Sequence, residues 1–231
     1  MQQKNELLSQ KMKLEQELQQ SMLASIKSQM NPHFLFNALN TIQSYIYTND
    51  KENASQYLGK FSTLTRMILD MSNKDIVTIA EEIKALQLYL ELEQLRFEDK
   101  LKYTFNVDNN ISTETTFIPS MLIQPYVENA IKHGLLHKKN DWFLSLHFTK
   151  ANEGITIIID DNGIGRKRSE ELNKHKAKHH QSFATNANRK RLEILNRGLM
   201  QHIALEVIDK KDSYGNSLGT SVKLFIPFLK K

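Results

Sequence analysis

The sequence predicts an α+β protein in which a helical hairpin precedes a domain of mixed helices and strands. Three observations lead to this fold class. Up to about residue 71, apolar residues recur every three or four positions, which is the helical period. Beyond residue 75, helical stretches intermix with short apolar runs typical of strands. The 231 residues, 40% of them hydrophobic, are enough for one or two domains with a sizeable core.

Residues 1–26 are predicted to form a coiled-coil linker. The first 30 residues contain no Gly or Pro, and apolar side chains recur every four positions at Leu14, Leu18, Met22, Ile26 and Met30. An ordinary surface helix is the alternative, because the heptads are too irregular to determine an oligomeric state.

Residues 27–74 are predicted to form the helical hairpin. Asn31-Pro32 resembles a cap followed by proline at the first helical position, so a helix restarts there or a longer one kinks. Both helices carry an apolar seam, formed by Leu35, Leu39, Ile42 and Ile46 in the first and by Tyr57, Phe61, Leu64, Ile68 and Met71 in the second. Because two helices make a poor core, we expect a second copy to complete a dimeric four-helix bundle.

His33 is predicted to lie on the polar face of the first hairpin helix. At about 100° per residue, a helical wheel places it opposite an apolar arc of Phe34, Leu35, Ala38, Leu39, Ile42, Tyr45 and Ile46. Asn37 shares the polar side, and Phe36 is an aromatic residue stranded there that a partner can contact. A packed core histidine is the alternative.

Residues 75–231 are predicted to form a domain with helices on one face of a mixed sheet. Thr78 and Glu81 make a capping box that opens a helix extending to about Phe97. Further helices are expected at 119–134 and 188–199, and strands at 101–107, 141–149, 154–160, 204–210 and 219–227.

The stretch "IIIDDNGIG" predicts a buried strand that runs directly into a ligand-binding loop. Gly163 and Gly165 let the backbone approach a ligand closely, and the carboxylate of Asp161 can accept a hydrogen bond from an amino group. A plain turn is the alternative, since "DNG" is a common turn sequence.

The stretch "QPYVENAIKHG" places Asn129 and His133 four residues apart on one helix face, with Glu128 and Lys132 beside them. An amide and an imidazole at this spacing can hold a hydrated divalent cation together with phosphate oxygens. An exposed polar helix face is the alternative.

Positive charge is concentrated in one segment. The net charge is +5, yet residues 166–191 hold nine Lys or Arg against two Glu, which leaves the rest of the chain slightly acidic. A basic segment confined to one place favours a local phosphate environment or a solvated loop over a nucleic-acid interface. A metal site in "KHKAKHH", at His175, His179 and His180, is disfavoured because the interleaved lysines repel a cation.

Composition also indicates in which cellular compartment the protein is expected. The sequence has no Cys, which excludes disulfides and thiol chemistry and is compatible with a reducing compartment. It has neither an apolar run of the ~20 residues that a membrane span needs nor a signal-peptide pattern. A cytoplasmic location is therefore expected.

Four motifs in order closely resemble the cytoplasmic part of LytS-type sensor histidine kinases. They are "NPHFLFNALN", "TIAEEIKALQLYLELEQLRFEDKL", "IPSMLIQPYVENAIKHG" and "IDDNGIG", and the likeness extends over nearly the whole chain from about Lys27. The resemblance implies that the hairpin forms a homodimer and that residues 75–231 fold as a GHKL (Bergerat) α/β sandwich that binds ATP. It also implies a sensor region and a cell-membrane anchor upstream of this chain.

The resemblance further implies roles for individual residues. His33 would accept the γ-phosphoryl group of ATP, Asn37 would position the reacting groups, and an aspartate on the receiver domain of a response regulator, a LytTR-type one for example, would then receive the phosphoryl group. Asn129 would hold Mg²⁺, and Asp161 would bind the adenine amino group. The nucleotide contacts expected in full are Asn129, Lys132, His133, Asp161, Gly163, Gly165 and Thr185.

The basic segment after Gly165, which the resemblance implies is a lid over the triphosphate, departs from the broad GHKL pattern. No glycine occurs between Gly165 and Gly198, and Ala184 stands about where a glycine is expected. A Cβ there can obstruct the phosphates or stiffen the lid. The alternative function is therefore a degenerate GHKL module that dimerises and binds a partner without kinase activity. Because Phe34 follows His33 where other histidine kinase families carry a carboxylate, no general base is assigned.

Overall fold

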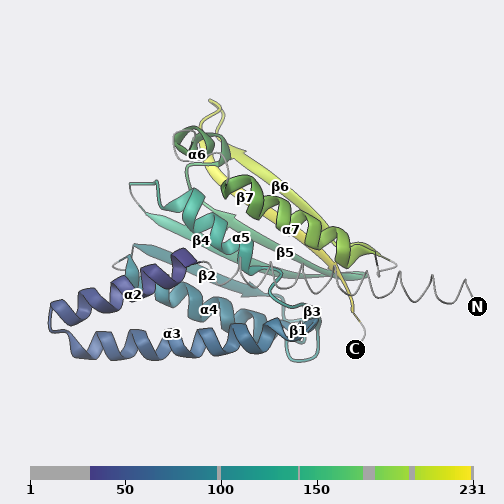
Figure 1. Ribbon diagram of the computed structural model, residues 1–231. Helices are drawn as coiled ribbons and strands as arrows, with labels where there is room; N and C mark the ends of the chain where they lie inside the picture. Colours follow the sequence, from purple (N-terminus) through teal and green to yellow (C-terminus); the bar gives the residue numbers. More distant parts are fainter. Residues whose placement is uncertain (1–31, 98–99, 140, 174–179, 198–200, 230–231) are drawn as a thin grey trace, which may run out of the picture.

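The computed structural model describes residues 32–97, 100–139, 141–173, 180–197 and 201–229 (Figure 1). In this view a helical hairpin lies below a five-stranded sheet, and further helices lie between the two and over one face of the sheet. The expected coiled-coil linker at residues 1–26 lies outside the described residues. In the part of the chain that is described, no helix is both long and apolar enough to cross a membrane.

The hairpin consists of α2 (Pro32–Tyr47) and α3 (Lys51–Ser72), which confirms the predicted pair of helices. In the turn between them Asn49 adopts a positive φ of 57°, a conformation that Asn tolerates better than most residues. Asp50 then caps α3, because its carboxylate accepts a hydrogen bond from the backbone N–H of Asn53 at 3.1 Å.

The apolar seam of α3 is buried within a single chain. We had expected a second copy to cover it, because two helices alone make a poor core. Four of the seam's five residues, Tyr57, Leu64, Ile68 and Met71, are at most 5% exposed, and α3 packs against both α2 and α4 (Ile79–Arg96). On α2, Phe34 lies 5.3 Å from Tyr89 of α4 between ring centroids, whereas Leu39 and Ile46 remain 50% and 63% exposed. Helix α4 thus covers the predicted seam of α3, and part of the α2 seam is left exposed.

We expect Leu64→Ala to lower the free energy of unfolding by about 2–5 kcal/mol, because it leaves a cavity among helices α2, α3 and α4. Urea unfolding measures this change. Leu218→Ala, at a leucine that is 52% exposed in strand β7 (Ser217–Pro227), is the matched control and should cost at most about 0.5 kcal/mol. Equal effects of the two substitutions would contradict the burial of the seam.

Helix α4 (Ile79–Arg96) begins at the predicted capping box. The hydroxyl of Thr78 accepts from the N–H of Glu81 at 3.1 Å, and the carboxylate of Glu81 accepts from the N–H of Thr78 at 2.8 Å. Just before it, β1 (Ile76–Thr78) pairs antiparallel with β3 (Phe117–Pro119). This small sheet was not predicted, since three-residue strands are too short to show an alternating pattern.

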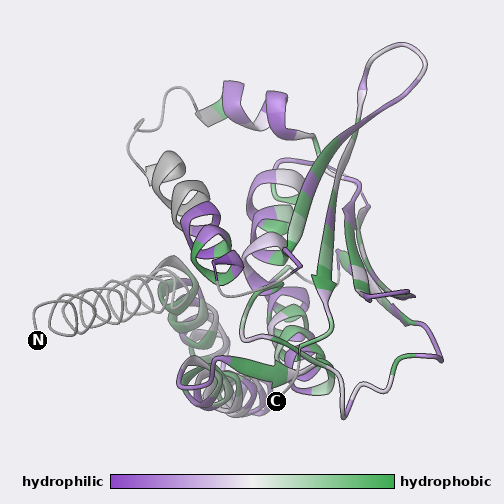
Figure 2. Cartoon of the chain, turned by 90° about the vertical axis from the view of Figure 1, so that its right-hand side faces the viewer, coloured by the Kyte–Doolittle hydropathy of each residue, from purple (hydrophilic) through white to green (hydrophobic). Residues whose placement is uncertain are grey.

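The main sheet has the strand order β2-β4-β5-β7-β6, with β2 parallel to β4 and every other pair antiparallel. Its strands are β2 (Leu101–Val107), β4 (Trp142–Ala151), β5 (Gly154–Asp161), β6 (Ala204–Lys211) and β7 (Ser217–Pro227). Alternate residues such as Ile155, Ile157 and Ile159 are buried. They belong to a common core with residues of α4 and α5. Figure 2 shows the helices gathered on one side of this sheet, which confirms the α+β class.

The remaining helices differ from the prediction at the stretch 119–134. It does not form one helix: Pro119 ends β3, a turn follows, α5 runs from Gln124 to Asn129, and a π-helix, η1, runs from Ala130 to Leu135. After β5 come α6 (Arg166–Asn173) and α7 (His180–Asn196), which begins earlier than the helix predicted at 188–199.

Candidate functional site

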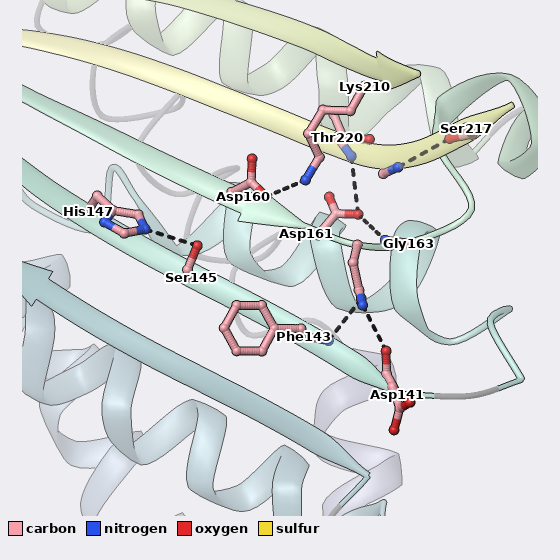
Figure 3. A network of polar contacts seen from close by, with 12 residues as sticks. Asp141, Phe143, Ser145, His147, Asp160, Asp161, Gly163, Lys210, Ser217 and Thr220 are labelled. Carbon is pink, nitrogen blue, oxygen red and sulfur yellow. Dashed lines mark hydrogen bonds and ion pairs between the residues drawn. The ribbon is translucent and has the colours of Figure 1, made fainter. Parts of the chain in front are cut away.

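Asp161 is a buried carboxylate at the last residue of β5. Its side chain is held in the loop because Oδ1 accepts hydrogen bonds from the backbone N–H groups of Gly163, at 2.7 Å, and of Thr220, at 3.3 Å (Figure 3). Burial raises the pKa of Asp161 to about 6, and the two N–H donors work against that rise. The site therefore presents a fixed carboxylate that is ionised at neutral pH.

The glycines let the D-x-G-x-G loop lie directly against η1. A Cβ on Gly163 would come within 2.3 Å of the carbonyl carbon of Gly134, and a Cβ on Gly134 would come within 2.8 Å of Asp161 Oδ1. The N–H of Ile164 donates to the carbonyl of Gly134 at 3.0 Å and closes the contact. The fold thus brings together the two motifs that the sequence singled out separately.

The π-helix changes the spacing that the sequence predicted for Asn129 and His133. Within η1 the N–H of Leu136 donates to the carbonyl of Ile131, five residues earlier, so residues four apart no longer lie as they do in an α-helix. Asn129 and His133 are both half-buried, and burial lowers the pKa of His133. The alternative interpretation of this segment as an exposed polar helix face is therefore wrong.

Glu128 and Lys132 are engaged with each other. Glu128 is 9% exposed and accepts from Gln124 Nε2 at 3.1 Å and from Lys132 Nζ at 3.4 Å, while burial raises its pKa. Within the described ranges, no three His, Cys, Asp or Glu side chains cluster as a metal site. The half-buried amide of Asn129 can supply one oxygen ligand, so a divalent cation here would need further oxygens, such as those of phosphates.

The basic segment begins directly after the loop, where the chain contacts β6 and β7. Gly165 has a φ of +76°, and a Cβ there would lie 2.1 Å from Ser217 Oγ, so a glycine is needed at this turn. Arg166 then donates two hydrogen bonds to Asp209 of β6, both at 2.7 Å. The side chains of Ala184 and Thr185, and residues 174–179, lie outside the description.

His33 lies in the first turn of α2, and its side chain is not described. Its neighbour Phe34 packs on Phe61 of α3 and Tyr89 of α4, with centroid distances of 5.9 Å and 5.3 Å. Phe36 is 63% exposed, as the wheel predicted, and Asn37 is half-buried. The backbone that carries His33 is thus anchored to the helix that precedes the sheet.

Two positions that the sequence did not single out also shape the site. Asn162 donates from Nδ2 to the carbonyl of Asp141 and accepts from the N–H of Phe143, both at 2.9 Å, which fastens the loop to the start of β4. Gly134 provides the close approach described above. The only sequence signal for either was its place inside a motif, since the contacts join segments far apart in the chain.

Comparison with known proteins bears on the same segments. Residues 21–101 match the family model described as "Histidine kinase". Sensor protein LytS of Staphylococcus haemolyticus is 34% identical over 148 residues, which are 64% of this chain and 25% of that protein. LytS of Staphylococcus saprophyticus is 32% identical over 207 residues, 89% of this chain and 34% of that protein. The resemblance to LytS-type sensor histidine kinases is confirmed.

The relatives are not all called LytS. Sensor histidine kinase YesM of Bacillus subtilis is 31% identical over 161 residues, which are 70% of this chain and 27% of that protein. The chain thus spans about a quarter to a third of the length of these relatives. The catalytic domain of histidine kinase ThkA overlays on 68% of the chain and 97% of its own length, at 11% identity and a TM-score of 0.45.

Proposed function

We propose that this chain is the kinase part of a sensor histidine kinase, which uses ATP to phosphorylate His33 and then transfers the phosphoryl group to an aspartate of a response regulator. The observation that carries the proposal is the contact of the D-x-G-x-G loop with the helix of Asn129, through Gly163 and Gly134. It places a fixed carboxylate near a segment with amide, imidazole and ammonium groups, which suits the base and phosphates of a nucleotide.

The nucleotide would be recognised at both ends. The carboxylate of Asp161 is fixed by two N–H groups, and its remaining lone pairs can accept from the adenine amino group. Gly163 and Gly165 would line the nucleotide, and Lys132, His133 and Thr185 would lie toward the phosphates. Asn129 would hold Mg²⁺ through its amide oxygen. The cation would neutralise charge on the phosphate oxygens.

The proposed reaction has two balanced steps. A neutral imidazole nitrogen of His33 attacks the γ-phosphorus, the bond to the β,γ-bridging oxygen breaks, ADP leaves, and the imidazole nitrogen that carried a proton releases it to solvent or a base. In the second step a carboxylate oxygen of the regulator attacks the same phosphorus, and the imidazole leaves and regains a proton. Asn37, one turn from His33 on α2, would position the reacting groups.

A homodimer is part of the proposal. Exposed apolar side chains remain on both hairpin helices, at Leu39 and Ile46 of α2 and at Leu58 and Leu69 of α3, each at least 48% exposed. A second copy packed on these residues would remove them from water and would form the four-helix bundle that the sequence predicts.

Incubation of the purified chain with Mg²⁺ and ATP labelled on its γ-phosphate tests the function. The expected product is labelled protein whose label is lost in acid and kept in alkali, as for a phosphohistidine. Bound ATP without labelled protein would instead support the degenerate module. A chain that neither binds ATP nor becomes labelled would overturn the proposed function.

We expect nucleotide affinity to fall as the pH drops through about 6, because burial raises the pKa of Asp161 to about 6. The adenine amino group is a donor, so it binds best to the ionised carboxylate, which predominates above this pKa. Calorimetric titration with ATP at pH 5 to 8 measures the change. In Asp161→Asn the affinity should be weaker throughout and should lack this pH step; an unchanged step would contradict the role of Asp161.

A further inference from the structure

The turn Ser120–Ile123 joins β3 to α5 and is held by a buried carboxylate of α4. Glu82 is 1% exposed and accepts from the N–H groups of Met121, at 2.8 Å, and of Ile123, at 3.1 Å. Met121 is itself buried and has a φ of +55°, which is rare for a residue with a long side chain. This backbone conformation persists only because its surroundings impose it.

The carbonyl groups of the same turn are held by a guanidinium of α7. Arg191 donates from Nη1 to the carbonyl of Met121 at 3.2 Å and from Nη2 to the carbonyl of Ser120. Arg191 and Glu82 also interact electrostatically: burial raises the pKa of Glu82 to about 7, and Arg191 opposes that rise. Although Arg191 belongs to the basic segment at 166–191, its guanidinium is engaged with backbone carbonyls of this turn.

The turn is also attached to the hairpin. Ser120 donates from Oγ to the carbonyl of Met71 at 2.6 Å, in the last turn of α3, and from its N–H to the carbonyl of Asp75 at 3.0 Å. One short turn therefore contacts the end of the hairpin, α4 and α7, and it leads directly into α5.

We propose that Glu82 and Arg191 form a buried clamp on the turn Ser120–Ile123, and that this clamp positions α5 and hence Asn129. The proposal rests on the proposed function, because it assigns Asn129 to the Mg²⁺ and phosphate end of the site. Both residues are positioning residues. Asn129 lies at the end of α5, six residues beyond Ile123, so a shift of the turn is carried along less than two helical turns.

The clamp acts on one end of the nucleotide and not on the other. Asp161 is held by Gly163 and Thr220, and Gly134 is bound separately by the N–H of Ile164. Loosening the turn should therefore disturb Asn129 while Asp161 keeps its place. This difference separates a positioning role from a merely structural one, which would weaken both ends alike.

The experiment compares Mg·ATP with adenosine, which lacks phosphates, as ligands in calorimetric titrations. The variants are Glu82→Gln, Arg191→Met and the double variant, with Arg191→Lys as the conservative one. Arg197→Met, just after α7, and Glu114→Gln, in an exposed loop, are matched controls that remove the same charges. Because a single removal leaves an uncompensated buried charge, the double variant is expected to fold better than either single variant.

We expect Mg·ATP to bind about tenfold more weakly to the double variant, equivalent to about 1.4 kcal/mol, with adenosine affinity changed less than about twofold and both controls unchanged. The Mg·ATP affinity of Arg191→Lys should lie between those of the unmodified chain and the double variant, since an ammonium reaches one carbonyl more readily than two. Equal losses for both ligands, or no loss for either, would overturn the clamp. An unmodified chain that binds no Mg·ATP would overturn the proposed function and the clamp together.

Hydrogen exchange of the unmodified chain keeps the proposal testable if the variants do not fold. The clamp predicts that the N–H groups of Met121 and Ile123 exchange slowly, and more slowly still with Mg·ATP bound, because Glu82 holds both. Exchange at the rate of the exposed loop around Glu114, with or without nucleotide, would overturn the clamp.

Discussion

His33→Gln is expected to abolish phosphorylation of the chain, lowering the acid-labile label by at least about a hundredfold, because an amide is not a nucleophile toward phosphorus. The stability of the chain should change by no more than about 0.5 kcal/mol if the imidazole lies on the polar face of α2. The measurements are label incorporation from γ-labelled ATP and thermal unfolding of the same samples.

His202→Gln is the matched control for this substitution. His202 is an exposed histidine just before β6, outside every proposed site, so its replacement should leave the label unchanged. A His33→Gln protein that unfolds at a much lower temperature would instead indicate a packed core histidine. A His33→Gln protein that keeps its label would show that another residue is the phosphoacceptor.

Gly163→Ala is expected to cost about 3 kcal/mol of stability and to weaken ATP binding at least about tenfold. The added Cβ would lie 2.3 Å from the carbonyl carbon of Gly134, and because that atom is backbone it cannot turn aside as a flexible side chain can. Relief requires the loop and η1 to separate, which breaks the contact that brings the two motifs together. Urea unfolding and calorimetric titration with ATP measure the two effects.

Gly59→Ala provides the control, since it makes the same chemical change where there is room. Nothing lies within 4 Å of a Cβ at Gly59, which is exposed in the middle of α3. Because alanine favours helix, this variant should gain about 1 kcal/mol and bind ATP as before. If Gly163→Ala behaves like Gly59→Ala, the close contact of loop and π-helix is wrong.

Elements with a strong local signal were predicted from the sequence. The Thr78–Glu81 capping box does begin α4, and β2 has the bounds 101–107 that its apolar pattern indicated. Both signals lie within a few neighbouring residues, so no knowledge of distant contacts was needed. Gly165 of the D-x-G-x-G loop is a partly similar case, because its φ of +76° itself favours glycine, whereas Gly163 is required by the distant backbone of Gly134.

Elements decided by distant contacts were predicted poorly. The stretch 119–134 has a helical pattern, yet Pro119 pairs in a strand with Ile76, and Glu82 and Arg191 fix the turn that follows. Likewise the seam of α3 was expected to need a second copy, because nothing in the hairpin indicated that α4 would cover it. The contacts that fix the turn after Pro119 join residues 39 or more positions apart, and an α3–α4 contact such as Lys60 to Glu91 spans 31 positions, both beyond the reach of periodicity.

By itself, therefore, the sequence determined the α+β class, the hairpin, most strands and the motifs that resemble LytS-type kinases. Only the tertiary structure decided that Gly134 meets Gly163, that Glu128 pairs with Lys132 in a buried place, and that Glu82 lies inside the protein. The physical reason is that a motif shows which chemical groups a segment can contribute to a site. Burial and the close approach of two backbones depend instead on how separate segments pack.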